Sequence, residues 1–164
     1  MGSYRTSRNL EASIFDYISQ NLKGTWSDIN IEKSFSRVYD ISLPIIVLRV
    51  ENTNYNRIEL GSNSISREVL ILVDIFAESD GQRLDIKDYL VSILKNEFPF
   101  YEYYTEANSS GNYVVKRKST NGRVNVLTIS DESINLNTAK NDLDKHDRYR
   151  HLIKMKVSLS KLEV

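Results

Sequence analysis

The segment from Ser64 to Ala77 constrains the fold of this chain more than any other stretch. As a strand it carries apolar side chains on both faces, with Val69, Ile71, Val73 and Ile75 on one and Leu70, Leu72 and Phe76 on the other. A strand of this kind must be covered on both sides. A helix can cover one side, and the other side needs a second layer or a second subunit. Asp74 interrupts the second face and needs a partner if it is buried.

Two segments have the apolar spacing of amphipathic helices. The first runs from Ser7 to Lys23 and is stopped by Gly24. The second runs from about Gln82 to Asn96, directly after the long strand, with Leu84 and Leu94 in its apolar stripe. In a strand, turn and helix unit the helix packs back onto the sheet, so we expect both helices to cover a sheet.

Further β-prone segments supply the rest of that sheet. Pro44 introduces a strand at Ile45–Val50, Asn52–Asn56 is predicted to be a polar turn, and Phe100–Tyr104 is an aromatic strand. Ile153–Ser160 alternates between apolar and polar residues, which predicts a strand with one buried and one wet face. The expected fold class is α+β, with a mixed, mainly antiparallel sheet covered by two helices and a projecting β-hairpin.

The hairpin is predicted between Tyr113 and Ile129. Asn121-Gly122 lies between two β-prone arms, and both central residues of a type I′ turn need the positive φ that these two residues tolerate. The arms are polar near the predicted tip, where four cationic residues gather: Lys116, Arg117, Lys118 and Arg123. This charge can contact an acidic protein surface or phosphate, and it also protects an exposed strand edge. A long polar loop is predicted from Ser130 to His146.

Length and composition narrow the class of protein. The 164 residues favour one domain, 1–164, in which residues 105–146 form a hairpin and long-loop extension. Lys and Arg number 22, as do Asp and Glu, so the net charge of zero disfavours a strongly basic nucleic-acid binder. The chain has no Cys, which excludes disulfides, thiolate zinc sites and cysteine nucleophiles. The longest apolar run, Val69–Val73, is far shorter than the roughly 18 residues of a membrane helix, so no membrane partner is expected.

Two groups of residues suit a catalytic interpretation, and each also has a simpler one. Asp74 with Glu68 can be compared with a metal-dependent nuclease site, but no Glu-x-Lys follows on the next strand. The alternative is an Asp that hydrogen-bonds the backbone or caps the turn at Ser79–Gly81. His146 and His151 lie among acidic residues, which suits a metal or acid–base cluster or else a solvated turn with surface salt bridges. We expect no enzyme activity and no cofactor.

The order of elements resembles that of the tail terminator (tail-completion, or minor tail) proteins of long-tailed bacteriophages. The residues that carry the resemblance are Ser66–Phe76 (SREVLILVDIF), the helix Leu84–Leu94 that follows, and the closing segment Asp147–Val157 (DRYRHLIKMKV). The resemblance extends over most of the chain, from about Leu10 to Leu159.

The resemblance implies a structural virion protein at the head–tail junction, assembled in the host cytoplasm. Such proteins form a ring, usually a homohexamer, on the head-proximal end of the tail tube, where the ring stops tube polymerisation and offers a docking surface to the head connector. The implied partners are further copies of the chain, the tail tube protein and the head connector or neck protein, with DNA passing through the ring without specific binding. We expect the subunit or tube interface to include Lys116, Arg117, Lys118, Arg123, Arg67 and Asp74.

Three other functions stay open from the sequence. A head–tail connector or neck protein is also a small ring-forming virion protein. A binding or regulatory module unrelated to virions would be a stable monomer or dimer without affinity for tail tubes. An enzyme would have an activity that is sensitive to chelators and lost on substitution of Asp74.

Overall fold

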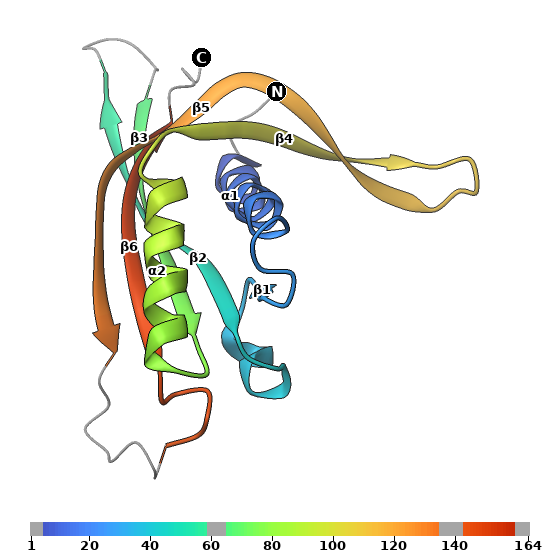
Figure 1. Ribbon diagram of the computed structural model, residues 1–164. Coiled ribbons are helices and arrows are strands. Elements are labelled where there is room, and N and C mark those ends of the chain that lie inside the picture. Colours follow the sequence, from blue (N-terminus) through green and yellow to red (C-terminus); the bar gives the residue numbers. More distant parts are fainter. Residues whose placement is uncertain (1–4, 59–64, 135–142, 160–164) are drawn as a thin grey trace.

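All six described strands belong to one sheet, in the order β1-β2-β3-β6-β5-β4 (Figure 1). The computed structural model describes residues 5–58, 65–134 and 143–159, with residues 119–121 described by their backbone alone. In chain order the elements are α1 (Thr6–Leu22), β1 (Asn30–Glu32), the 3-10 helix η2 (Phe35–Asp40), β2 (Ile45–Arg57), β3 (Ile65–Phe76), α2 (Asp80–Leu94), β4 (Phe98–Ala107), β5 (Tyr113–Ile134) and β6 (Arg150–Leu159). β1 and β2 are parallel, and the other neighbouring strands are antiparallel. The expected α+β class is therefore confirmed.

Both helices lie on one face of the sheet (Figure 1) because each presents a single apolar stripe. The buried residues of the two stripes recur every four positions: Leu10, Ile14, Ile18 and Leu22 in α1, and Ile86, Leu90 and Leu94 in α2. Leu84 was predicted in the stripe of α2, and this is wrong, since its side chain is 43% exposed. Leu84 precedes Ile86 by two residues, which is about 200° around a helix.

β3 lies between β2 and β6; the face toward the helices is fully covered, and the other face is covered in part. One face packs against the helices. At the end of the other face, Phe76 packs against Val38 of η2 in a second, smaller core. Further along this face the half-buried Leu70 and Leu72 are the register partners of Lys156 and Lys154 on β6, whose aliphatic stems lie beside them.

β2 is longer than predicted. It runs without a break from Ile45 to Arg57, so the polar turn predicted at Asn52–Asn56 is wrong. The strand pairs with β3 on both sides of a register shift between Val50 and Thr53. Pairing with β3 therefore overrides the turn preference of the Asn residues.

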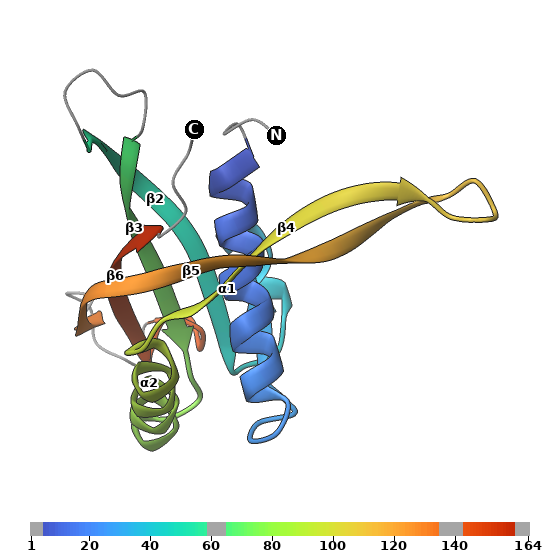
Figure 2. The ribbon, with the colours of Figure 1, turned by 90° about the horizontal axis from the view of Figure 1, so that it is seen from above.

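A projecting hairpin is present, but its turn is not at the predicted position. β5 is one strand from Tyr113 to Ile134, so Asn121-Gly122 lies inside a strand and the predicted turn is wrong. The hairpin consists of β4 and β5, and the chain reverses at Asn108–Asn112 (Figure 2). β5 also replaces the start of the long loop predicted from Ser130, and residues 135–142 of that prediction lie outside the described residues.

Candidate subunit interface

We call the outer part of this hairpin, Tyr101–Ala107 with Tyr113–Ser119, the arm. It extends away from the helices and the rest of the sheet (Figures 1 and 2). Its two strands pair with each other alone among the described strands, since β5 meets β6 first at Val124. The side chains of Tyr113 and Val115 are 79% and 65% exposed. A two-stranded ribbon is marginally stable by itself, so the arm is suited to contact with another molecule.

Helix α1 holds the root of the arm through two polar residues within its apolar stripe. Ser13 Oγ accepts a hydrogen bond from the backbone N–H of Tyr101 at 2.9 Å, and Asn9 Oδ1 accepts one from the N–H of Tyr103 at 3.3 Å. Both Ser13 and Asn9 are buried. The helix therefore satisfies the outer edge of β4 at the root, in the place of a further strand.

Asp16 of α1 binds both strands of the arm at the same root. Tyr103 Oη donates a hydrogen bond to Asp16 Oδ2 at 2.6 Å, and Arg117 Nη1 lies 3.5 Å from the same oxygen. The Arg117 guanidinium also stacks 4.2 Å from the ring centre of Tyr101. Burial, and then the hydrogen bond to Asp16, raise the pKa of Tyr103, so its phenol stays protonated and donates across the neutral range.

The turn at the tip of the arm satisfies its own polar groups. Asn108 Oδ1 accepts hydrogen bonds from the backbone N–H groups of Ser110 and Asn112, at 3.0 and 2.9 Å. Gly111 has a φ of 77°, which favours glycine because it has no Cβ. The turn residues carry no charge, so the cationic tip predicted from the sequence is not formed.

The four predicted cations lie along β5, and their charges are largely compensated. Three are in ion pairs: Lys116 with Glu106 (2.7 Å), Arg117 with Asp16 (3.5 Å) and Arg123 with Glu97 (2.6 Å). Lys118 lies opposite Glu102 in the ladder. Exposed pairs contribute at most about 1 kcal/mol each. The cations therefore support the arm slightly and leave little net positive charge for a phosphate or an acidic surface.

β5 has an open edge at its other end, which we define as Asn125–Ile134. This segment pairs with β6 on one side, and on the other side β4 pairs no further than Val124. Leu127 lies at a register shift between Val126 and Thr128, and its side chain is 47% exposed. Unpaired edges are templates for strand addition, so the open edge is a second candidate contact.

Asp74 and Arg67, which were also expected in the interface, lie inside the subunit. Asp74 is 2% exposed; its carboxylate accepts a hydrogen bond from Arg49 Nη2 at 3.0 Å and lies 3.5 Å from Arg150 Nη2. The predicted need for a partner is confirmed, but the partners are two arginines rather than the backbone or the turn at Ser79–Gly81. The positive charges of the two guanidinium groups also disfavour the binding of a metal cation at this carboxylate. Arg67 is 9% exposed and packs over the ring of Tyr55.

His146 and His151 are buried in two separate networks, so the solvated turn predicted for them is wrong. His146 Nε2 lies 2.8 Å from the Ile41 carbonyl, which can only accept, so Nε2 donates there, and Nδ1 lies 2.8 Å from Asp144 Oδ1. The backbone N–H of His146, followed by its ring, holds the pKa of Asp144 below its usual value. This network ties the loop before β6 to the loop after η2.

His151 joins α2 to the sheet. Its Nδ1 lies 2.6 Å from Arg83 Nη1, and its Nε2 lies 2.7 Å from Asp131 Oδ1. An arginine can only donate, so Nδ1 accepts and Nε2 carries a proton that it donates to Asp131. With both nitrogens engaged, the ring is held in a structural role.

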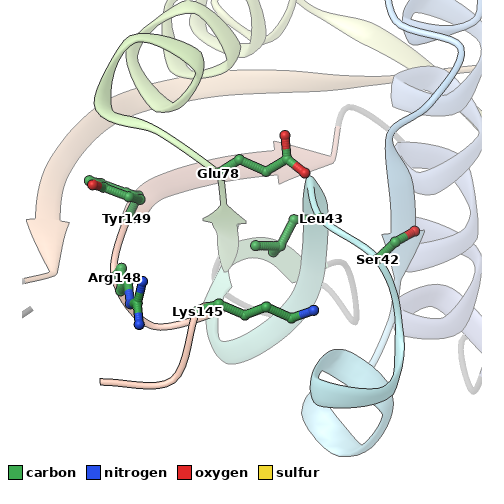
Figure 3. Close-up of a pocket in the computed structure, with 6 residues that line it drawn as sticks. All are labelled: Ser42, Leu43, Glu78, Lys145, Arg148 and Tyr149. Atoms are coloured by element: carbon green, nitrogen blue, oxygen red, sulfur yellow. The ribbon is translucent and has the colours of Figure 1, made fainter. Parts of the chain in front are cut away.

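A pocket of about 350 Å³ lies between the loop before β2 and the loop before β6 (Figure 3). Its lining residues are Ser42, Leu43, Glu78, Lys145, Arg148 and Tyr149. In Figure 3 the Lys145 side chain extends past Leu43 toward Ser42. The lining combines two cations with one carboxylate, so it does not clearly select an anionic or a cationic ligand. It includes no His, the side chain that most readily transfers protons at neutral pH.

The described residues show neither a metal-binding cluster nor a membrane-spanning helix. Among the described residues, no group of three or more His, Cys, Asp or Glu side chains is placed to hold a metal ion. No described helix combines the length and the apolar character needed to cross a membrane. Comparisons with protein-family models and with curated proteins give no match for this chain. The arm and the open edge are therefore the features on which a function can be argued.

Proposed function

We propose that this protein is a structural component of a bacteriophage virion, a tail terminator that forms a ring at the head-proximal end of the tail tube. In this role it stops tube polymerisation and provides the docking surface for the head connector. Its partners are further copies of itself in a homohexamer, the tube protein and the connector. The role needs neither catalysis nor a cofactor.

The arm is the observation that carries this proposal. It exposes Tyr113 and Val115 far from the core of its own subunit, and beyond its root it is supported by main-chain pairing and exposed ion pairs. A ribbon of this kind gains stability when a neighbouring molecule packs on it. A helix-covered sheet with a projecting hairpin is also the architecture that the resemblance to tail terminators implies.

The charge distribution supports a ring through which DNA passes. The net charge is zero, and three of the cations along β5 are paired with carboxylates. Affinity for the phosphate backbone grows with each cation that neutralises a phosphate. Compensated cations therefore favour passage of DNA over its retention.

The test is deletion of the gene from a phage that carries it, followed by negative-stain electron microscopy of the lysate. We expect abnormally long tails that are detached from filled heads, and normal particles when the wild-type gene is supplied on a plasmid. Tails of normal length that fail to join heads would contradict the terminator role and identify a connector. Intact, infectious particles after deletion would exclude both virion roles.

A further inference from the structure

β5 carries the arm at one end and the open edge at the other. Figure 2 shows the arm extending to one side of the molecule and the far end of β5 lying on the opposite side. The two surfaces belong to one continuous strand, so the arm cannot fold back onto the open edge of its own subunit. Among the described strands of the subunit, no further one pairs with either surface.

Along the arm, the edge of β5 that faces away from β4 presents main-chain N–H groups; we call it the outer edge of the arm. In an antiparallel ladder, residue pairs alternate between exchanging two hydrogen bonds and pointing both N–H groups away. The Tyr103 N–H points away from β5, toward Asn9, so its ladder partner Arg117 also points its N–H outward. The same alternation turns the N–H groups of Val115 and Tyr113 outward. No described strand pairs with β5 along this edge.

We propose that the outer edge of the arm in one copy of the chain pairs with the open edge of β5 in the next copy, so that neighbouring subunits share a continuous sheet. No described strand pairs with either edge, and both carry exposed apolar side chains, Val115 on the arm and Leu127 on the open edge. Because the edges lie on opposite sides of the subunit, the contact is head-to-tail, and such contacts close into rings or extend as filaments. The role of the ring in a virion rests on the proposed function, whereas the pairing itself does not.

Length and charge both favour a second copy as the occupant. The arm segment 113–119 is shorter than the open edge 125–134 and fits within it. Most charges near both edges are already paired inside each subunit, such as Lys116 with Glu106 on the arm and Glu132 with Lys154 at the open edge. Two copies therefore approach without a net repulsion, and the pairing leaves no new unpaired charge.

A matched pair of proline substitutions tests the proposal. Val115 and Thr105 face each other in the arm, and neither N–H is used in the arm's own ladder, so Pro at either position removes no hydrogen bond within it. Val115→Pro is expected to raise the concentration needed for assembly about tenfold or more, measured by size-exclusion chromatography with light scattering. Thr105→Pro is expected to assemble like the wild type. Thermal melting by circular dichroism should show that both variants stay folded.

Disulfide cross-linking maps the contact independently, because the chain has no cysteine of its own. Val115→Cys combined with Thr128→Cys or Ser130→Cys should give, under mild oxidation, a ladder of covalent multimers on a non-reducing gel. The control combines Val115→Cys with Leu84→Cys on the exposed surface of α2 and should remain monomeric on the gel.

Four results would overturn the pairing. These are a Val115→Pro variant that assembles like the wild type, a Thr105→Pro variant that fails to assemble, a wild type that stays monomeric, and dimers formed by Val115→Cys alone, which indicate an arm-to-arm contact. The phage experiment fails separately. If Val115→Pro still forms rings, the pairing is wrong but the terminator role is unaffected. If deletion of the gene gives normal particles, the terminator role is wrong, but cross-links would still support the pairing.

Discussion

The body of the molecule and its arm are stabilised by different forces. In the body, both helices and the sheet share one apolar core, and the buried Asp74 is held by Arg49 and Arg150. In the arm beyond its root, stability comes from the β4–β5 ladder and from exposed pairs such as Lys116 with Glu106. The body therefore supplies the folding stability, and the arm can be altered for contact with a partner at little cost to the fold.

The largest expected difference between the two regions comes from the same substitution placed in each. Val157 of β6 is fully buried, so Val157→Asp places an unpaired charge in the core and should destabilise the protein by about 4 kcal/mol or more. Val115 is 65% exposed, and Val115→Asp should change the free energy of unfolding of the unassembled subunit by less than about 0.5 kcal/mol. Thermal melting by circular dichroism measures both. Equal melting temperatures for the two variants would show that β6 is not part of the core.

The next largest effect is expected inside the body, at Asp74. Asp74→Ala leaves Arg49 and Arg150 without their shared carboxylate, and should destabilise the fold by about 3 kcal/mol, the lower end for a broken buried pair, because the Arg49 side chain is 31% exposed. The control is Glu51→Gln, which removes the exposed partner of the same arginine and should change stability by about 1 kcal/mol or less. Urea denaturation compares them, and a neutral Asp74→Ala would contradict the role of the network.

A smaller effect is expected where the body meets the arm. Ser13→Ala leaves the partly buried backbone N–H of Tyr101 without its acceptor and should cost about 1 kcal/mol, the lower end for a lost buried partner. The loss should appear chiefly as faster amide hydrogen exchange in the arm, while exchange in β3 stays slow. Ser19→Ala in the same helix is the control. If the arm exchanges at the wild-type rate in Ser13→Ala, the helix does not hold its root.

The smallest effect is a pH dependence at the same root. The pKa of Tyr103 is raised in the folded state, so its neutral phenol adds stability that is fully present below the ordinary tyrosine pKa of about 10 and is lost as the pH rises above it. The Tyr103→Phe variant has no phenol to ionise, so it does not lose stability in this way as the pH rises. The difference in urea midpoint between the wild type and Tyr103→Phe should therefore shrink from pH 8 to pH 11. A constant difference would contradict the hydrogen bond to Asp16.

The helices and the long strand could be predicted because their signals are local. Leu10, Ile14 and Ile18 recur every four residues, and the predicted first helix, Ser7–Lys23, differs from α1 by one residue at each end. β5 could not be predicted, because Asn121-Gly122 favours a turn locally, whereas β4 pairs with Ser119 and Arg123 on either side of this dipeptide, across a register shift, and so continues the strand. The true turn, Asn108–Asn112, lies within residues 105–146, for which the sequence predicts a hairpin and long-loop extension.

The contacts of the candidate interface residues could be predicted only in part from the sequence. Asn9 and Ser13 are four residues apart beside an apolar stripe, and this buried polar pair is a signal that could have indicated the root of the arm. The need of Asp74 for a partner followed from its place in an apolar strand. Its partners, Arg49 and Arg150, could not be found, because they come from strands that only the tertiary structure brings together.

The position of β6 has a consequence for the folding of the nascent chain on the ribosome. β6 lies between β3 and β5, yet it is the last described strand in chain order. Until Arg150–Leu159 has emerged, the nascent chain holds two separate half-sheets, β1-β2-β3 and β4-β5, each with a long unsatisfied edge. Such edges are prone to aggregate. The sheet therefore closes only after β6 has been made, and a chaperone that shields extended segments would act in the interval before β6 joins the two halves.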